Sequence, residues 1–298
     1  MLQIILGAIS LGLLWAIMTI GVYITYRILD IADLTVEGSI AMGAAIVAFS
    51  IFNGMNPFIA TGLAFLGGMA AGLVTGILHT KLKIPALLAG ILTMIALYSV
   101  NLRIMGKANL SLLRIDTVYT SLENFGLSPN NAVMLFGFLS VMGIVGLLYW
   151  FFGTEMGCAI RATGNNPQMA RAQGINTNNM ITLGLVISNG LVALSGSLIA
   201  QSQSFADVQM GIGSIVIGLA SVIIGEVIFG TRNFLNCLIS LVLGAITYRI
   251  IIAMVLKMGM PANDLKLFTA ITVAIALSLP VFKTYLRPIK KSIFGGDL

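Results

Sequence analysis

Residues 38–78 read GSIAMGAAIVAFSIFNGMNPFIATGLAFLGGMAAGLVTGIL, without a single Asp, Glu, Lys or Arg. Residues 1–26, 124–154 and 172–206 also lack these charged side chains. A helix needs about 20 apolar residues to cross the hydrocarbon core of a bilayer. The runs 38–78 and 172–206 are therefore long enough for two crossings each, or for one crossing and a re-entrant piece, and they predict a membrane protein.

The composition of the whole chain agrees with these runs. Hydrophobic residues make up 58% of the 298 residues and charged residues 9%, and the mean hydropathy is +1.02. Because a soluble domain carries about 25% charged residues, we expect an all-α polytopic membrane protein with a single transmembrane domain, residues 1–298. Hydropathy predicts about nine transmembrane helices, to which re-entrant segments would add, over roughly residues 3–26, 36–52, 57–78, 84–106, 131–153, 179–203, 210–230, 234–256 and 265–283.

The distribution of Lys and Arg predicts the orientation. With the C-terminus inside, ten of them face the cytoplasm: Arg27, Lys81, Lys83, Arg161, Arg171, Arg232, Lys283, Arg287, Lys290 and Lys291. Four face outward: Lys107, Arg114, Lys257 and Lys266. The positive-inside rule therefore favours an external N-terminus and a basic cytoplasmic tail, residues 284–298. Arg103 and Arg249 are expected to reach the outer interface from within spans, and Glu226 is either an interfacial charge or a residue with a gating or helix-anchoring role.

An internal repeat is the second signal. Ala32-Asp33 recurs as Ala206-Asp207, and Gly38-Ser39-Ile40 recurs as Gly213-Ser214-Ile215. Further on, Pro85-Ala86 recurs as Pro261-Ala262. In the predicted topology the first copy begins inside and the second outside, so the halves are inverted repeats, which are typical of transporters. The Gly-Ser pairs could let a helix begin within the membrane boundary.

The sequence lacks the residues that several classes of function require. One histidine, His79, and two distant cysteines, Cys158 and Cys237, predict no metal site. There is no nucleotide-binding Gly-x4-Gly-Lys-Ser/Thr pattern and no Gly-x-Ser-x-Gly nucleophile pattern. The scattered basic residues predict no nucleic-acid partner. We expect no enzyme, no cofactor and no buried carboxylate at mid-depth, which argues against a proton-coupled carrier.

One polar segment separates two apolar runs: TEMGCAIRATGNNPQMARAQGI, residues 154–175. Either Asn165 or Asn166 can cap a short helix that has Pro167 at its first position, and Gly174 can terminate it. The helix is expected over residues 167–173, with Ala170 and Ala172 exposed. A helix this short is unstable alone, so it either docks into a groove on a partner protein or is an ordinary interfacial loop.

The residues of this segment carry a family resemblance. The spacing of Gly157, Ala159, Arg161, Ala162, Asn166, Pro167, Ala170 and Gly174 resembles the coupling loop of permease subunits from branched-chain amino acid and ribose-type ABC importers. Leu194-Ser-Gly-Ser-Leu198 and Ile31-Ala-Asp-Leu-Thr-Val-Glu-Gly38 agree with it. Within that family, the Asn-Asn-Pro version looks most similar to permeases for tryptophan or other aromatic amino acids.

The resemblance implies a type II-like importer permease in a bacterial cytoplasmic membrane. It implies a cytoplasmic coupling loop over residues 154–178, whose ATPase contact would be formed by Gly157, Arg161, Ala162, Asn166, Pro167, Ala170 and Gly174. The implied partners are an ATPase subunit that binds the ATP, an extracytoplasmic binding protein and a second permease copy, so that the permease is a homodimer.

Polar side chains on apolar spans are the candidates for the substrate pathway: Thr93, Tyr98, Asn101, Ser188, Asn189, Ser195 and Gln201. The alternative is that these side chains hydrogen-bond the backbone or a neighbouring helix. The alternative function is a secondary, ion-coupled carrier, which inverted repeats also permit.

Overall fold

The computed structural model describes residues 2–124 and 126–257, together with the isolated positions 267, 270, 271, 274 and 278. Seven of its helices are long and apolar enough to cross a membrane. They are α1 (Leu2–Tyr23, continued by the π-helix η1, Ile24–Ile28), α2 (Thr35–Phe52), α3 (Pro57–Thr80), α4 (Ala86–Met105), α6 (Pro129–Phe152), α9 (Thr177–Gln203) and α11 (Phe234–Lys257). The shorter elements are α5 (Thr120–Glu123), α7 (Glu155–Asn165), α8 (Pro167–Ala172), α10 (Ser214–Phe229), β1 (Asn109–Ser111) and β2 (Phe205–Asp207).

These seven helices correspond to the first six predicted spans and the eighth. The span predicted over residues 210–230 differs, because α10 begins only at Ser214 and has 16 residues. At about 1.5 Å per residue it is about 24 Å long, less than a hydrocarbon core of about 30 Å. Gly213, with φ of 82°, precedes its first turn. The ninth predicted span, 265–283, lies mostly outside the described residues, and the predicted tail, 284–298, lies entirely outside them.

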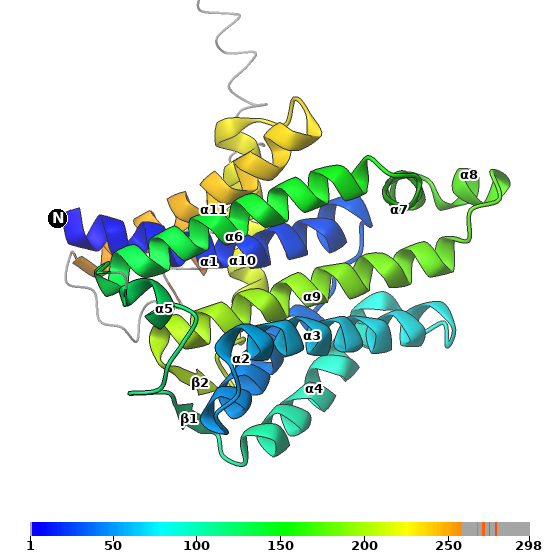
Figure 1. Cartoon of the computed structure of the whole chain (residues 1–298). Coiled ribbons are helices and arrows are strands. Elements are labelled where there is room, and N and C mark those ends of the chain that lie inside the picture. The colour runs from blue at the N-terminus through cyan, green and yellow to red at the C-terminus, as the bar shows by residue number, and fades with distance from the viewer. Residues whose placement is uncertain are drawn as a thin grey trace, which may run out of the picture.

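Helix α9 is the central helix of the bundle. It lies beside α1, α2 and α3, and 78% of its most apolar window is buried (Figure 1). Glycines allow the helices to approach closely: a Cβ on Gly43 of α2 would overlap the carbonyl oxygen of Ala193, and one on Gly196 would overlap that of Ile40. Small residues at such crossings are how membrane helices pack without a hydrophobic driving force between them.

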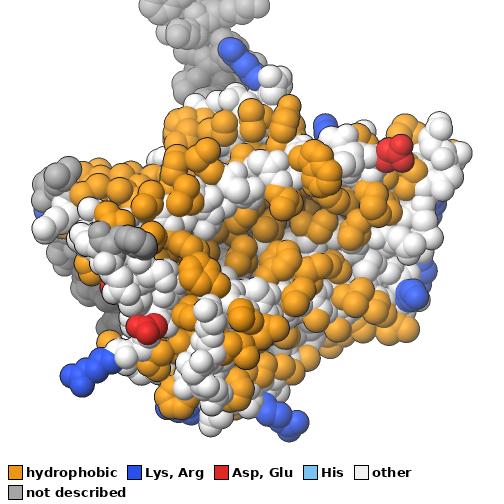
Figure 2. Space-filling view, in the orientation of Figure 1, with side chains coloured by type: hydrophobic (Ala, Val, Ile, Leu, Met, Phe, Trp, Pro, Cys, Tyr) orange, Lys and Arg blue, Asp and Glu red, His pale blue; other side chains and the backbone are white. Residues whose placement is uncertain are grey.

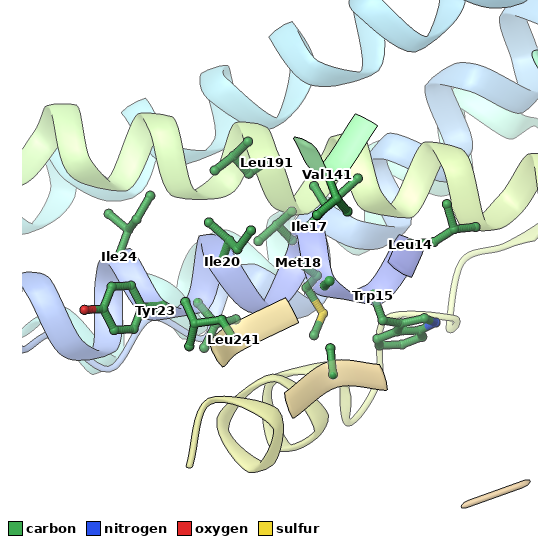
Figure 3. Packing of buried hydrophobic residues seen from close by; sticks show 14 of the residues in the cluster. Leu14, Trp15, Ile17, Met18, Ile20, Tyr23, Ile24, Val141, Leu191 and Leu241 are labelled. Atoms are coloured by element: carbon green, nitrogen blue, oxygen red, sulfur yellow. The ribbon is translucent and has the colours of Figure 1, made fainter. Parts of the chain in front are cut away.

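Helix α1 is apolar on all sides, and it is buried accordingly. Figure 3 shows its side chains between Val141 of α6, Leu191 of α9 and Leu241 of α11. In contrast, α6 turns much of its surface outward. Figure 2 shows hydrophobic side chains over the middle of the face that contains α6, with charged side chains near its margins. This is the surface expected of a helix that faces lipid.

The connecting segments gather at two ends of the bundle (Figure 1). At one end β1 pairs antiparallel with β2, with Leu110 opposite Ala206. At the other end α7 packs on η1, so closely that a Cβ on Gly164 would overlap the carbonyl oxygen of Ile28. The segments predicted as external therefore meet each other, as do those predicted as cytoplasmic.

Two charged side chains are tied into the helix packing. Arg249, expected to reach the outer interface, instead places its guanidinium carbon 4.2 Å from the centre of the Trp15 ring, an attractive cation–π arrangement. Arg103 is exposed, as expected. Glu226 accepts a hydrogen bond of 3.1 Å from Nε of Arg27, so it anchors α10 to η1.

Candidate functional site: the α7–α8 segment and a buried polar network

The predicted cap of α8 is confirmed. Oδ1 of Asn166 accepts hydrogen bonds from the backbone N–H groups of Gln168 (3.1 Å) and Met169 (3.0 Å), and Pro167 occupies the first helical position. Gly174 has φ of 81°, and the N–H of Ile175 reaches back to the Ala170 carbonyl at 3.0 Å. This is the left-handed termination that glycine favours, and it ends α8 in a defined direction.

Two details of this segment differ from the sequence-based expectation. Ala170 is fully buried, because α8 lies against α9 and turns this methyl group inward, whereas Ala172 is exposed. A second helix, α7, precedes α8, and the side chain of Thr154 caps it by accepting from the Gly157 N–H at 3.4 Å. The sequence-based prediction did not include α7, because it used only the capping signal at Asn165 or Asn166 and not the one at Thr154.

The seven candidate coupling residues differ in how far they are buried. Gly157 and Ala170 are buried against the bundle, and a Cβ on Gly157 would overlap the carbonyl oxygen of Phe151. Ala162 is partly buried, and the four exposed residues are Arg161, Asn166, Pro167 and Gly174. Met169 adds an apolar side chain that is 47% exposed. The segment therefore has an inward face that fixes it and an outward face available to another protein.

A second constellation lies inside the bundle, around Asp33. Its Oδ2 accepts a 2.7 Å hydrogen bond from Nδ2 of Asn189, and its Oδ1 accepts a 2.9 Å bond from the N–H of Thr35. Oδ1 of Asn189 in turn accepts from the hydroxyl of Ser39 at 2.7 Å. Asn189 lies midway along α9, about 18 Å from Thr177 and about 21 Å from Gln203. The expectation that no carboxylate is buried at mid-depth is therefore wrong.

The network continues through threonine hydroxyls. Oγ1 of Thr75 lies 2.8 Å from that of Thr35 and 2.9 Å from that of Thr93, so α2, α3 and α4 are joined in one chain of hydrogen bonds. Thr93 is the only one of these three that the sequence singled out. Asp33 could have been found from its spacing, because an aspartate two residues before the first residue of a helix is a common local cap.

The remaining candidate pathway residues mostly bond to neighbouring helices. The hydroxyl of Ser188 donates to the Gly21 carbonyl and that of Ser195 to the Leu14 carbonyl, each at 2.7 Å. Nδ2 of Asn101 donates to the Gly38 carbonyl at 3.3 Å, while its Oδ1 has no partner among the described residues. Tyr98 is 48% exposed on α4, whereas Thr93, Asn101, Ser188, Asn189, Ser195 and Gln201 are buried.

Gln201 belongs to a separate cluster at the strand end of the bundle. Its Oε1 accepts from the Val118 N–H and its Nε2 donates to the Thr61 hydroxyl, both at 3.0 Å. Nearby, the Tyr119 hydroxyl donates to the Leu198 carbonyl at 2.9 Å, and burial raises the pKa of Tyr119, which keeps it a donor. Gln201 and Tyr119 both line an open cavity of about 610 Å³.

The starts of α2 and α10 are joined. Oε1 of Glu37 accepts a 2.9 Å hydrogen bond from the N–H of Gly213, and a Cβ on Gly211 would overlap the Glu37 carbonyl oxygen. The turn at Asp33 has a counterpart at Asp207, whose Oδ1 accepts from the Gln209 N–H at 2.7 Å. Among the described residues, no group of His, Cys, Asp and Glu could hold a metal ion.

Comparison with known proteins agrees with this architecture. Residues 4–277 match the family model described as branched-chain amino acid transport system / permease component. The chain is 46% identical to the tyrosine transport system permease protein of Clostridioides difficile (strain R20291), over 90% of this chain and 88% of that protein. It is 28% identical to the ribose import permease protein of Escherichia coli (strain K12), over 61% of this chain and 56% of that protein.

A solved structure shares the fold. An inward-facing ABC transporter of the proposed metal-chelate type has a TM-score of 0.51 and 15% sequence identity, covering 95% of this chain and 85% of that one. The family match spans most of the sequence, and the seven apolar helices make the chain a multi-pass membrane protein. The chain therefore belongs to the permease family of branched-chain amino acid transport systems, which are membrane subunits of ABC transporters.

Proposed function

We propose that this chain is the transmembrane subunit of an ATP-driven importer. In this proposal α7 and α8 form the contact with a separate ATPase subunit, and two copies of the chain enclose the translocation pathway. The observation that carries the proposal is the α7–α8 segment: a capped two-helix projection, fixed to the bundle by Gly157 and Ala170, with Arg161, Asn166, Pro167 and Gly174 outward.

The direction of transport follows from the proposed orientation. With α7 and α8 in the cytoplasm, the end that carries β1, β2 and α5 faces outward and receives substrate from an extracytoplasmic binding protein. ATP binding then draws the two ATPase subunits together and moves both α8 helices, so that the dimer opens inward. The proposed membrane is a bacterial cytoplasmic membrane, with the C-terminus of the chain on the inner side.

The substrate we propose is an aromatic amino acid, on the strength of the 46% identity to a tyrosine transport permease. If the halves are inverted repeats, as the sequence predicts, the pathway is expected near their junction, where Glu37 meets Gly213. Thr93, Tyr98, Asn101, Ser188, Asn189, Ser195 and Gln201 are proposed to line or position this pathway. Of these, Tyr98 is directly accessible. The buried residues act by tying α9 to α1, α2 and α3, and α4 to α2 and α3.

The test is uptake into proteoliposomes that contain this chain and the ATPase co-expressed from its operon. We expect radiolabelled tyrosine to accumulate only when two conditions hold. The vesicles must contain ATP on the side where the ATPase can bind it, and binding protein must be present on the outer side. Leucine and ribose at the same concentration serve as competitors. Uptake that needs neither ATP nor binding protein would contradict the proposal.

A second candidate is an ion-coupled carrier, and Asp33 is the observation that favours it. A carboxylate buried to 2% exposure at mid-depth is a common coupling-ion ligand in such carriers. The same proteoliposomes separate the two functions: a carrier would accumulate substrate under a proton or sodium gradient without ATP. An importer would show no response to either gradient.

A further inference from the structure

Two adjoining hollows lie beside the start of α11. The smaller, of about 290 Å³, is lined in part by Arg27, Arg161, Glu226 and Arg232. The larger, of about 630 Å³, is lined by side chains from the end of α6, from α7 and its N-cap, and from the start of α11, among them Tyr149, Trp150, Phe152, Thr154, Arg161, Phe234 and Leu235. Arg161, Asn233 and Phe234 line both hollows, so the two lie side by side.

The smaller hollow has an excess of positive charge. Glu226 is paired with Arg27 at 3.1 Å, and the guanidinium of Arg161 lies over the Phe234 ring at 5.3 Å. Within the described part of the chain, neither Arg161 nor Arg232 forms an ion pair. A further carboxylate, that of Asp30, lines a third hollow together with Arg161. The first turn of α11 adds the partial positive charge of a helix N-terminus.

The larger hollow has the opposite character. Trp150 is 71% exposed and Tyr149 53% exposed in the last turn of α6, and Leu235 is 41% exposed at the start of α11. Tryptophan and tyrosine concentrate where a membrane helix passes from lipid to water. An aromatic, apolar hollow thus opens toward the bilayer, and a basic hollow adjoins it on the polar side.

We propose that this double hollow binds an anionic phospholipid. Its phosphate would lie against Arg161 and Arg232, and its acyl chains would follow Trp150 and Leu235. Basic pockets between transmembrane helices at the cytoplasmic interface are suited to such headgroups. A free phosphate would fill only the smaller hollow, and an acidic peptide would leave the lipid-facing hollow empty. One amphipathic ligand accounts for both.

The position of Arg161 gives the lipid a regulatory role. Arg161 belongs to α7, which leads directly into α8, while Trp150 and Leu235 belong to α6 and α11. A bound lipid would therefore hold the coupling segment against the bundle and make its position depend on the anionic lipid content of the membrane. This role, and the assignment to the cytoplasmic leaflet, rest on the proposed function; the binding site itself does not.

The experiment is native mass spectrometry of the purified chain, without ATPase, titrated with phosphatidylglycerol or with phosphatidylcholine. We expect the wild type to retain one phosphatidylglycerol that the Arg161→Gln/Arg232→Gln variant binds roughly thirtyfold more weakly, since each arginine near the lipid surface adds a fewfold attraction. Trp150→Ala should also weaken retention. Arg103→Gln, which removes an exposed arginine from the other end of the bundle, is the matched control and should retain the lipid.

Three results would overturn the proposal. The first is equal retention of phosphatidylglycerol by wild type and the double variant. The second is displacement of the lipid by millimolar inorganic phosphate with no effect of Trp150→Ala, which would indicate a free-phosphate site. The third is loss of the lipid from the Arg103→Gln control to the same extent as from the double variant, which would show that retention depends on overall positive charge and not on this double hollow. Because lipid retention is read without ATPase or ATP, it can fail or succeed independently of the importer function.

Discussion

Asp33 and Asp207 head the two copies of the proposed repeat, and their local geometry is the same while their surroundings differ. In each, Oδ1 accepts from the N–H two residues on, at 2.9 Å and 2.7 Å. In each, Oδ2 accepts from an asparagine side chain, Asn189 at 2.7 Å and Asn109 at 3.2 Å. Yet Asp33 is 2% exposed inside the bundle, and Asp207 lies partly exposed on β2.

The comparison separates what local sequence determines from what packing determines. An aspartate forms this turn with its own backbone wherever the chain permits it, so both copies show it. Burial depends on neighbouring helices, and only Asp33 is enclosed by α2, α4 and α9. The same residue type is therefore a surface turn in one half of the chain and the centre of a buried network in the other.

The largest effect on the free energy of unfolding is expected when the Asp33 carboxylate is removed, and removal of the Asp207 carboxylate is the comparison. Asp33→Ala leaves two buried donors, the Thr35 N–H and the Asn189 amide, without their acceptor, at about 1–3 kcal/mol each. Asp207→Ala should cost less than about 1 kcal/mol, because water can replace its contacts. Thermal unfolding of the purified variants in one detergent measures the difference. Equal shifts in the two midpoints would contradict the distinction between the sites.

A smaller effect is expected where the two copies meet. Glu37→Ala removes the acceptor for the Gly213 N–H and should lower the free energy of unfolding by about 1.5–3 kcal/mol, the range for hydrogen bonds to charged groups. Glu37→Gln keeps an acceptor oxygen and should recover at least half of that loss. If the two variants unfold at the same temperature, the hydrogen bond does not stabilise the junction.

A stability loss smaller than that of Glu37→Ala is expected outside the bundle, at two glycines of which only one should affect transport. Gly174 and Gly54 have φ of 81° and 82°, and a Cβ on either would meet nothing within 4 Å. Valine at either position carries a left-handed backbone penalty of about 1–2 kcal/mol, so both variants should unfold alike. Only Gly174→Val should abolish ATP-driven uptake, because it redirects the end of α8. Full ATP-driven uptake by the Gly174→Val variant would contradict the proposed coupling role of α7 and α8.

Much of the α8 cap could be predicted from the sequence because its signals are local. Asn166, Pro167 and Gly174 act on their own backbone within a few residues, and the structure has all three in the expected roles. Ala170 could not be predicted in the same way, because its burial depends on how α8 lies against α9. An alanine side chain does not indicate, from sequence alone, which face of a short helix will pack against a neighbouring helix.

The seven long helices were predictable from hydropathy to within a few residues, but the path of the chain between them was not. Hydropathy averages over a window, so it placed Asp33 in a cytoplasmic loop and missed that the chain returns into the bundle before α2 begins. The glycines before Ser214 gave a better indication, because α10 does begin directly after Gly213; that this start lies within the membrane stays a prediction. Partners of buried polar groups, such as Asn189 for Asp33, come from helices far apart in sequence and need the fold.

The central claim is that this chain works as a pair bound to ATPase subunits through α7 and α8. Native mass spectrometry of the complex, expressed with its operon and gently solubilised, tests it most directly. The account predicts two copies of this chain with two ATPase subunits, and loss of the ATPase from the Gly174→Val variant but not from Gly54→Val. Two different permeases with the ATPases would replace the homodimer with a heterodimer. The chain alone, over several mild detergents, would contradict the importer and favour the carrier built around Asp33.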